Sequence, residues 1–217
     1  MKKMLFKEML LSASILSYIF IAAAFLTFAP GYPILLAGLF TTLGIFYSFQ
    51  AMRENNDIRY SLLLPVAKAD IVKAKFAFVL FIEICSFIVM TIVTLIRMTV
   101  LKDADVYVQN GLMTANLTYL GFILILFAVF NFVFVRGFFK TGYYFAKPLI
   151  AYGILMFLTI AVGESLHFIP GLGAFNAFGF DPILYQQIVF SAGLIAFVLL
   201  TILALKKSIR TFEQIDL

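Results

Sequence analysis

Residues 55–96 read NNDIRYSLLLPVAKADIVKAK followed directly by FAFVLFIEICSFIVMTIVTLI. The first part is polar and basic and contains Pro65, whereas Phe76–Ile96 is an apolar run whose only charged residue is Glu83. At a rise of ~1.5 Å per residue, a helix of this length crosses a hydrocarbon core of ~30 Å. The stretch therefore predicts a membrane-spanning helix that begins at the end of a polar segment.

The rest of the chain repeats this alternation. Of its 217 residues, 64% are hydrophobic and only 12% are charged, which is too apolar for a soluble domain of this size. The apolar runs are continuous and do not alternate with period two, so they indicate helices and not the strands of a barrel. We predict a single all-α integral membrane domain over residues 1–217. Its six transmembrane helices are expected at about 9–29, 33–52, 76–96, 117–135, 148–168 and 183–205, with a polar loop at 53–75.

The basic residues predict how these helices are oriented. Fourteen of the 16 Lys and Arg residues fall on one side of the six-helix topology, and only Arg97 and Lys102 fall on the other. Cytosolic loops carry the excess of basic residues, which places both termini and the 53–75 loop in the cytosol. The net charge of +5 is then explained by contact with anionic lipid headgroups, and no nucleic-acid partner is expected.

Two segments leave alternatives open. Residues 1–10 precede a run that is longer than the apolar region of a cleaved signal peptide. They are either an amphipathic helix at the membrane surface or a basic tail that only sets orientation. Residues 163–182, GESLHFIPGLGAFNAFGFDP, are rich in Gly and Phe and poor in charge. They form either a re-entrant helical hairpin before the last span or a plain loop that touches headgroups.

The chain lacks the common motifs of catalysis. No glycine is followed directly by lysine, so there is no phosphate-binding loop, and there is no H-E-x-x-H or G-x-S-x-G. Cys85 and His167 are the only residues of their types, so a disulfide or a histidine metal cluster within the chain is not expected. We therefore predict that the chain is not an enzyme and holds no cofactor. Work driven by ATP must come from a partner.

The 53–75 loop has the pattern of two helices separated by a proline. Pro65 disfavours helix in the residue before it, and Asp70 suits the first turn of a helix that continues into the third span. A short helix that lies across the cytosolic end of the bundle offers a surface to which a soluble partner can bind. The alternative is a connector whose lysines bind headgroups.

Three segments resemble one family of transporters. Residues 62–76 read LLLPVAKADIVKAKF, residues 139–147 read FKTGYYFAK, and the chain ends in KSIRTFEQIDL. In this order they resemble the loop after span two, the segment between spans four and five, and the C-terminus of small ABC-2 type permeases. Within this family, the chain resembles the membrane subunits of bacterial phenol-soluble-modulin exporters.

This resemblance implies a function and a set of partners. The chain would be the permease of an exporter of amphipathic or hydrophobic peptides in the bacterial plasma membrane. It would pair with a second permease, of the same or a related chain, and with two copies of a cytosolic ATP-binding subunit that holds ATP and Mg. The docking and coupling residues that the resemblance implies are Glu54, Asp57, Arg59, Pro65, Lys68 and Asp70.

Polar residues within the spans are candidates for the cargo path. Glu83 would line a cavity, pair with a basic residue such as Arg53, or serve packing alone, because buried charges are costly in lipid. Glu164 and His167, three residues apart, would form a gate contact or an exposed polar pair. Asn131 suits a hydrogen bond between helices.

A stripe of small residues in the second span suits close helix packing. It would contact either a second permease or another helix of the same subunit. Its members are Ala37, Thr41, Gly44 and Ser48.

Two functions from other classes remain as alternatives. A self-sufficient secondary carrier or channel needs ionisable groups and broken helices near the midplane, where the sequence offers only Glu83 and no interior proline. A non-transporting membrane module, for assembly or immunity, needs neither a partner ATPase nor a wet cavity.

Overall fold

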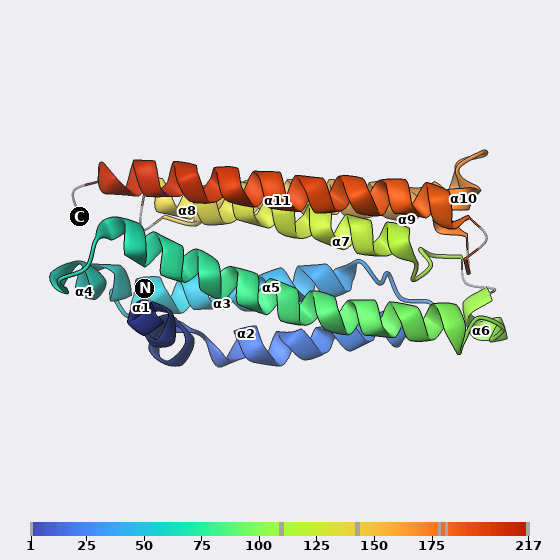
Figure 1. The fold of residues 1–217 in the computed structure, drawn as a ribbon, viewed down its shortest axis with the longest axis horizontal. Coiled ribbons are helices and arrows are strands. Elements are labelled where there is room, and N and C mark those ends of the chain that lie inside the picture. Colours follow the sequence, from blue (N-terminus) through green and yellow to red (C-terminus); the bar gives the residue numbers. More distant parts are fainter. Residues whose placement is uncertain (1, 109–110, 142–143, 178, 181, 216–217) are drawn as a thin grey trace.

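The protein is a bundle of long helices. The computed structural model describes residues 2–108, 111–141, 144–177, 179–180 and 182–215, and the regular secondary structure within them is entirely helical. The main helices lie side by side along one direction (Figure 1). They are α3 (Leu36–Glu54), α5 (Lys68–Thr99), α7 (Leu117–Val129), α9 (Ala146–Ser165) and α11 (Ile183–Glu213). The all-α prediction is confirmed for these residues.

Four helical segments of the described chain are long and apolar enough to cross a membrane: 68–99, 117–139, 146–165 and 183–213. A fifth is obtained if Lys3–Ser12 and Ile15–Phe28, which meet at a bend of 95°, count as one span. The predicted span at 33–52 corresponds to α3, which is 19 residues long but carries Gln50, Arg53 and Glu54 near its end. By length and composition the described helices thus provide four or five spans, and six stays a prediction.

The N-terminal residues form two helical segments where the sequence predicted one span at 9–29. Helix α1 (Lys2–Lys7) continues into a π-helical turn, η1 (Glu8–Ser12), and the chain then turns at Ala13 and Ser14, which are extended. Ser14 caps the next helix, α2 (Ile15–Ile19), which continues as the 3₁₀ helix η2 (Phe20–Phe28). The separate N-terminal helix agrees with the amphipathic segment expected at residues 1–10.

The short helices gather at the two ends of the bundle. Helices α1, α4 (Asp57–Leu63) and α8 (Arg136–Phe139) lie at the end where α11 finishes, which we call the α4 end (Figure 1). Helices α6 (Asp105–Val108) and α10 (Gly173–Asn176) lie at the opposite end. The basic segments 53–75 and 136–147 thus share one end, as their charge predicted. Which end faces the cytosol stays a prediction.

The described part of segment 163–182 does not form a helical hairpin. Helix α9 continues to Ser165, and the three-residue 3₁₀ turn η4 (Leu166–Phe168) and four-residue α10 follow it. Between them Pro170 cannot continue a helix, and Gly171 has a φ of +87°. Asn176 Oδ1 accepts a 2.8 Å hydrogen bond from the backbone N–H of Thr114, so α10 is held against the start of α7.

The core lies around α7 and its continuation. In an 18-residue apolar stretch of segment 117–139, which joins α7, the π-helical turn η3 (Phe130–Val135) and α8, 72% of the residues are buried. The corresponding share is 17% in each of α9 and α11, which expose apolar faces suited to lipid. After α7, η3 and α8 bring aromatic rings against α3. The ring centres of Phe134 of η3 and Phe138 of α8 lie 5.2 and 5.0 Å from that of Phe49. Phe139 continues the cluster to Phe212 of α11, at 5.5 Å.

Helices α7 and α11 cross at two glycines. A Cβ atom added to Gly121 would lie 2.7 Å from the carbonyl oxygen of Val189, and one added to Gly193 would meet the carbonyl oxygen of Gly121. Both obstacles are backbone atoms, which cannot move aside as a side chain can. Such close approach is how small residues stabilise helix pairs in lipid.

We predict that Gly193→Ala lowers the free energy of unfolding by ~1–3 kcal/mol, because the added methyl group forces α11 away from α7. The measurement is the thermal unfolding midpoint of the purified protein in detergent. Gly153→Ala in α9 is the matched control, since a Cβ there meets nothing within 4 Å. Equal midpoints for the two variants would show that the crossing is not tightly packed.

Candidate functional site

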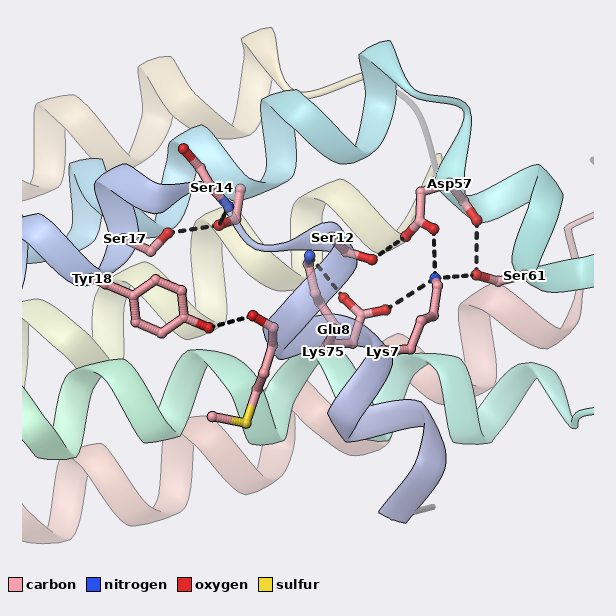
Figure 2. Close-up of polar contacts among 11 residues, drawn as sticks. Lys7, Glu8, Ser12, Ser14, Ser17, Tyr18, Asp57, Ser61 and Lys75 are labelled. Carbon is pink, nitrogen blue, oxygen red and sulfur yellow. Dashed lines mark hydrogen bonds and ion pairs between the residues drawn. The ribbon is translucent and has the colours of Figure 1, made fainter.

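Four charged side chains and two serines meet between the N-terminal helices and the 53–75 loop (Figure 2). Lys7 and Glu8 come from α1 and η1, Asp57 from α4, and Lys75 from α5. Ser12 of η1 and Ser61 of α4 complete the group, which we call the ionic cluster. It contains two cations and two anions, so its formal charge is zero.

Glu8 bridges the two lysines. Its Oε2 atom lies 3.0 Å from Lys75 Nζ, and its Oε1 atom lies 3.4 Å from Lys7 Nζ. Because Lys75 belongs to α5, this carboxylate connects the N-terminal helix directly to the longest helix of the bundle.

Asp57 makes the connection to α4. Its Oδ1 atom lies 2.5 Å from Lys7 Nζ, and its Oδ2 atom accepts a 2.9 Å hydrogen bond from Ser12 Oγ. Lys7 also donates to Ser61 Oγ at 2.6 Å. Both serines are buried, and the two carboxylate oxygens of Asp57 are held separately, one by Lys7 and the other by Ser12.

The pair of Glu8 and Lys75 is removed from water, since each side chain is only 1% exposed. Lys75 Nζ also lies 5.2 and 5.4 Å from the ring centres of Phe49 and Phe78. A single buried charge costs several kcal/mol, and a buried pair is tolerated only when both members are present and hydrogen-bonded. Each member of the cluster therefore depends on the others.

The bend at Ala13 and Ser14 brings η1 to this position. The backbone N–H of Ser14 donates to Ser48 Oγ of α3 at 2.8 Å, and Ser17 Oγ donates to the carbonyl oxygen of Gly44 at 2.7 Å. Tyr18 closes the bend by donating to the carbonyl oxygen of Met9 at 2.6 Å. The small-residue stripe of α3 is thus used within the subunit, where Gly44 and Ser48 receive the N-terminal helices.

The other predicted coupling residues lie apart from the cluster. Arg59 and Pro65 are exposed, and Glu54 accepts a 2.9 Å hydrogen bond from Gln50 within α3. Asp70 forms a half-exposed ion pair with Lys73 at 3.6 Å. Lys68 donates to the carbonyl oxygen of Ile215 at 2.6 Å and so holds the end of α11.

The loop has the helix–proline–helix structure that the sequence predicted. Helix α4 ends at Leu63, and α5 begins at Lys68 with Asp70 in its first turn. Between α3 and α4 the chain reverses at Asn56, which has a φ of +51° and is a residue type that tolerates the left-handed region.

The candidate cargo residues do not form one site. Glu83 is fully buried, and its Oε2 atom accepts a 3.0 Å hydrogen bond from Asn131 Nδ2, which also donates to Thr201 Oγ1 at 3.1 Å. Among the described residues Glu83 forms no ion pair, and the Arg53 guanidinium lies 4.4 Å from the ring centre of Phe145, so the alternative in which Glu83 pairs with Arg53 gains no support. The bond predicted for Asn131 between helices is confirmed.

Glu164 and His167 were the proposed gate at the opposite end. Glu164 Oε2 accepts a 2.8 Å hydrogen bond from the backbone N–H of Met113. The side chain of His167 lies outside the described residues, so a contact between the two stays a prediction.

Sequence reasoning missed Glu8 as a site residue and treated Lys7 and Lys75 only as charges that set orientation. One signal was present: Glu8 is the only acidic residue before Glu54. An acidic residue at the start of an apolar run needs a cation, and Lys75 stands where the basic loop enters the third span.

We predict that Lys75→Met lowers the free energy of unfolding by ~3–5 kcal/mol, because Glu8 would keep only the longer contact to Lys7. The double variant Glu8→Gln/Lys75→Met should recover part of this loss, since no buried charge is left without its partner. The measurement for both variants is the thermal unfolding midpoint of the purified protein in detergent.

The matched control is Asp70→Asn/Lys73→Gln, which removes an ion pair whose side chains are 37% and 44% exposed. Exposed pairs contribute ~0–1 kcal/mol, so its midpoint should stay near that of the unchanged protein. If the double variant at Glu8 and Lys75 is no more stable than Lys75→Met alone, the conclusion that each buried charge requires the other is wrong.

No curated protein and no solved structure shows a significant match to the chain. A family model described as "ABC-2 family transporter protein" matches residues 3–213, which is nearly the whole length and includes α1, the ionic cluster and α11. The apolar helices and this match agree on a membrane protein with several spans. The chain therefore belongs to the ABC-2 transporter family.

Proposed function

We propose that the chain is the permease subunit of a bacterial ABC exporter and that α4 receives force from a separate ATP-binding subunit. Membership of the ABC-2 family supports a role as the membrane subunit of an ABC transporter, a kind of subunit that is generally not catalytic itself. ATP and Mg would then be bound by the partner.

The observation that carries this proposal is that one face of α4 is packed against the rest of the subunit while the opposite face is exposed. Its inner face is fixed in the subunit, because Ile58 and Ser61 are buried and Asp57 belongs to the ionic cluster. Its outer face presents Tyr60 and Leu63, which are 60% and 85% exposed, beside the exposed Arg59. Arginine and aromatic residues on a rigid element are typical of surfaces that bind another protein.

Force on α4 enters the bundle through the ionic cluster in two steps. It passes from Asp57 to Lys7, which moves the N-terminal helix, and then from Glu8, the neighbour of Lys7, to Lys75 of α5. Helix α5 is continuous from Lys68 to Thr99, so it carries motion from the α4 end to the opposite end. The N-terminal helix exposes Phe6, Leu10 and Leu11, which suits a position in the membrane surface.

The remaining partners are part of the same proposal. Two ATP-binding subunits and a second permease would complete the transporter in the plasma membrane. The cargo would be amphipathic or hydrophobic peptide, as the resemblance to phenol-soluble-modulin exporters implies. Glu83, Glu164 and His167 remain candidates for the cargo path, and opening of the bundle would be needed to expose Glu83.

The first test is isolation of the chain from its native membrane in mild detergent, followed by mass spectrometry of the proteins that accompany it. A stoichiometric subunit with a phosphate-loop motif is the expected result. A chain that emerges alone, or only with itself, would refute the coupling proposal and favour a secondary carrier or a non-transporting module.

In the same experiment, Arg59→Glu should reduce the captured ATP-binding subunit about ten-fold, because the reversed charge faces the partner at the centre of α4. Lys206→Glu is the matched control, since Lys206 is an exposed cation on α11 at the same end of the bundle. Equal losses in both variants would indicate general electrostatic attraction and not docking on α4.

Asp57→Asn should leave docking of the ATP-binding subunit on α4 intact but interrupt the transmission of force from α4 to the N-terminal helix. The exposed face of α4 is unchanged, so the ATP-binding subunit should still be captured and should still hydrolyse ATP. Export of a labelled amphipathic peptide from vesicles should fall about ten-fold, because Lys7 loses its ionic partner on α4. Asp103→Asn, which changes an exposed carboxylate just beyond the end of α5, far from α4, should export normally. Full export by Asp57→Asn would exclude the route through Lys7.

A further inference from the structure

A surface groove lies between the η3–α8 segment and α11 at the α4 end of the bundle. Its volume is about 340 Å³, which is within the range of ~300–1,000 Å³ typical of small-ligand sites. Its lining residues are Phe132, Val133, Arg136, Gly137, Lys140 and Thr211. The groove is separate from the ionic cluster, with which it shares no residue.

Three cations surround the groove. Arg136 and Lys140 are one helical turn apart and both line it, and Lys207 borders it from α11. The ring of Phe132 joins them: the Arg136 guanidinium lies 4.8 Å from its centre and Lys207 Nζ lies 5.6 Å from it. Two cations on one aromatic ring concentrate positive charge at this point.

Several other cations at the α4 end are already bound within the described part of the chain, and Arg59, Lys147, Lys206 and Arg210 are exposed and do not line the groove. Lys7 and Lys75 belong to the ionic cluster, Lys73 pairs with Asp70, and Lys68 binds backbone oxygens of the C-terminal segment. In contrast, Arg136, Lys140 and Lys207 form no ion pair with any described residue, and no carboxylate lines the groove. Three converging cations without an anion indicate an anionic ligand.

We propose that this groove binds the headgroup phosphate of an anionic phospholipid. Phe132 and Val133 lie about two helical turns deeper in the bundle than Lys140, so the groove runs from the interface toward the hydrocarbon region. Leu203, one turn deeper than Lys207 on α11, is exposed and continues this surface with an apolar side chain. A lipid matches both parts, with its phosphate on the cations and an acyl chain along Phe132 and Leu203. Basic pockets between transmembrane helices are known to bind anionic headgroups.

The test is native mass spectrometry of the purified protein in mild detergent, titrated with phosphatidylglycerol, with phosphatidylcholine or with inorganic phosphate. The groove variant Arg136→Gln/Lys140→Gln/Lys207→Gln is compared with Lys147→Gln/Lys206→Gln/Arg210→Gln. The latter removes the same charge from three exposed positions at the same end that do not line the groove.

We expect the unchanged protein to bind phosphatidylglycerol more tightly than phosphatidylcholine. The groove variant should bind it roughly 100-fold more weakly, at about five-fold per basic residue, while the control variant keeps its affinity. The single variants Lys140→Gln and Lys207→Gln change exposed side chains and should each lose about five-fold, which tests the groove even if the triple variant does not fold. Equal losses in the groove and control variants, equal affinity for both lipids, or full displacement of phosphatidylglycerol by inorganic phosphate would each overturn the proposal.

Discussion

The α4 end of this protein depends on one buried ion pair, between Glu8 and Lys75. Neither charge is tolerated alone at 1% exposure, so the N-terminal helix has to fold back until η1 meets α5. The 95° bend, the π-helical turn that carries Glu8 and Ser12, and the serine contacts to α3 are the local means of reaching this position. π-Helical turns often occur at functional sites, and here the turn supplies Glu8 and Ser12, two of the six residues of the ionic cluster.

The charged part of the α4 end is continuous with an aromatic part. Lys75 lies over Phe49, and the rings then continue through Phe138 and Phe139 to Phe212 of α11. Packed rings transmit displacement because interiors are close-packed and cannot be compressed freely. A displacement of α4 or of the N-terminal helix would therefore also displace α11. Farther along the bundle, Asn131 binds both Glu83 of α5 and Thr201 of α11. Helices α5 and α11 are therefore connected a second time, through this hydrogen-bonded side chain.

The sequence predicted those features that depend on local composition. The helices, the break at Pro65 and the grouping of the basic segments at one end follow from apolar runs, proline geometry and charge placement. The ionic cluster could not be predicted, because Glu8 and Lys75 are separated by 67 residues and only the fold brings them together. The turn at Ala13 and Ser14 was also missed, since neither residue interrupts the apolar pattern. For the small-residue stripe of α3 the sequence left two uses open, and the contacts of Thr41 with Ser86 and of Ser48 with the backbone of Ser14 agree with packing inside the same subunit.

The separation of Glu8 from Lys75 also determines the order of events during biosynthesis. At ~5–20 residues per second, Lys75 is added to the growing chain roughly 3–13 s after Glu8. Until Asp57 and then Lys75 have been added, the first helix lacks these partners, so its charged face needs water while its apolar face rests in the lipid surface. The pair can close only after Lys75 has been added to the chain. The newly made protein thus first holds its N-terminal helix as a peripheral segment and later draws it into the bundle.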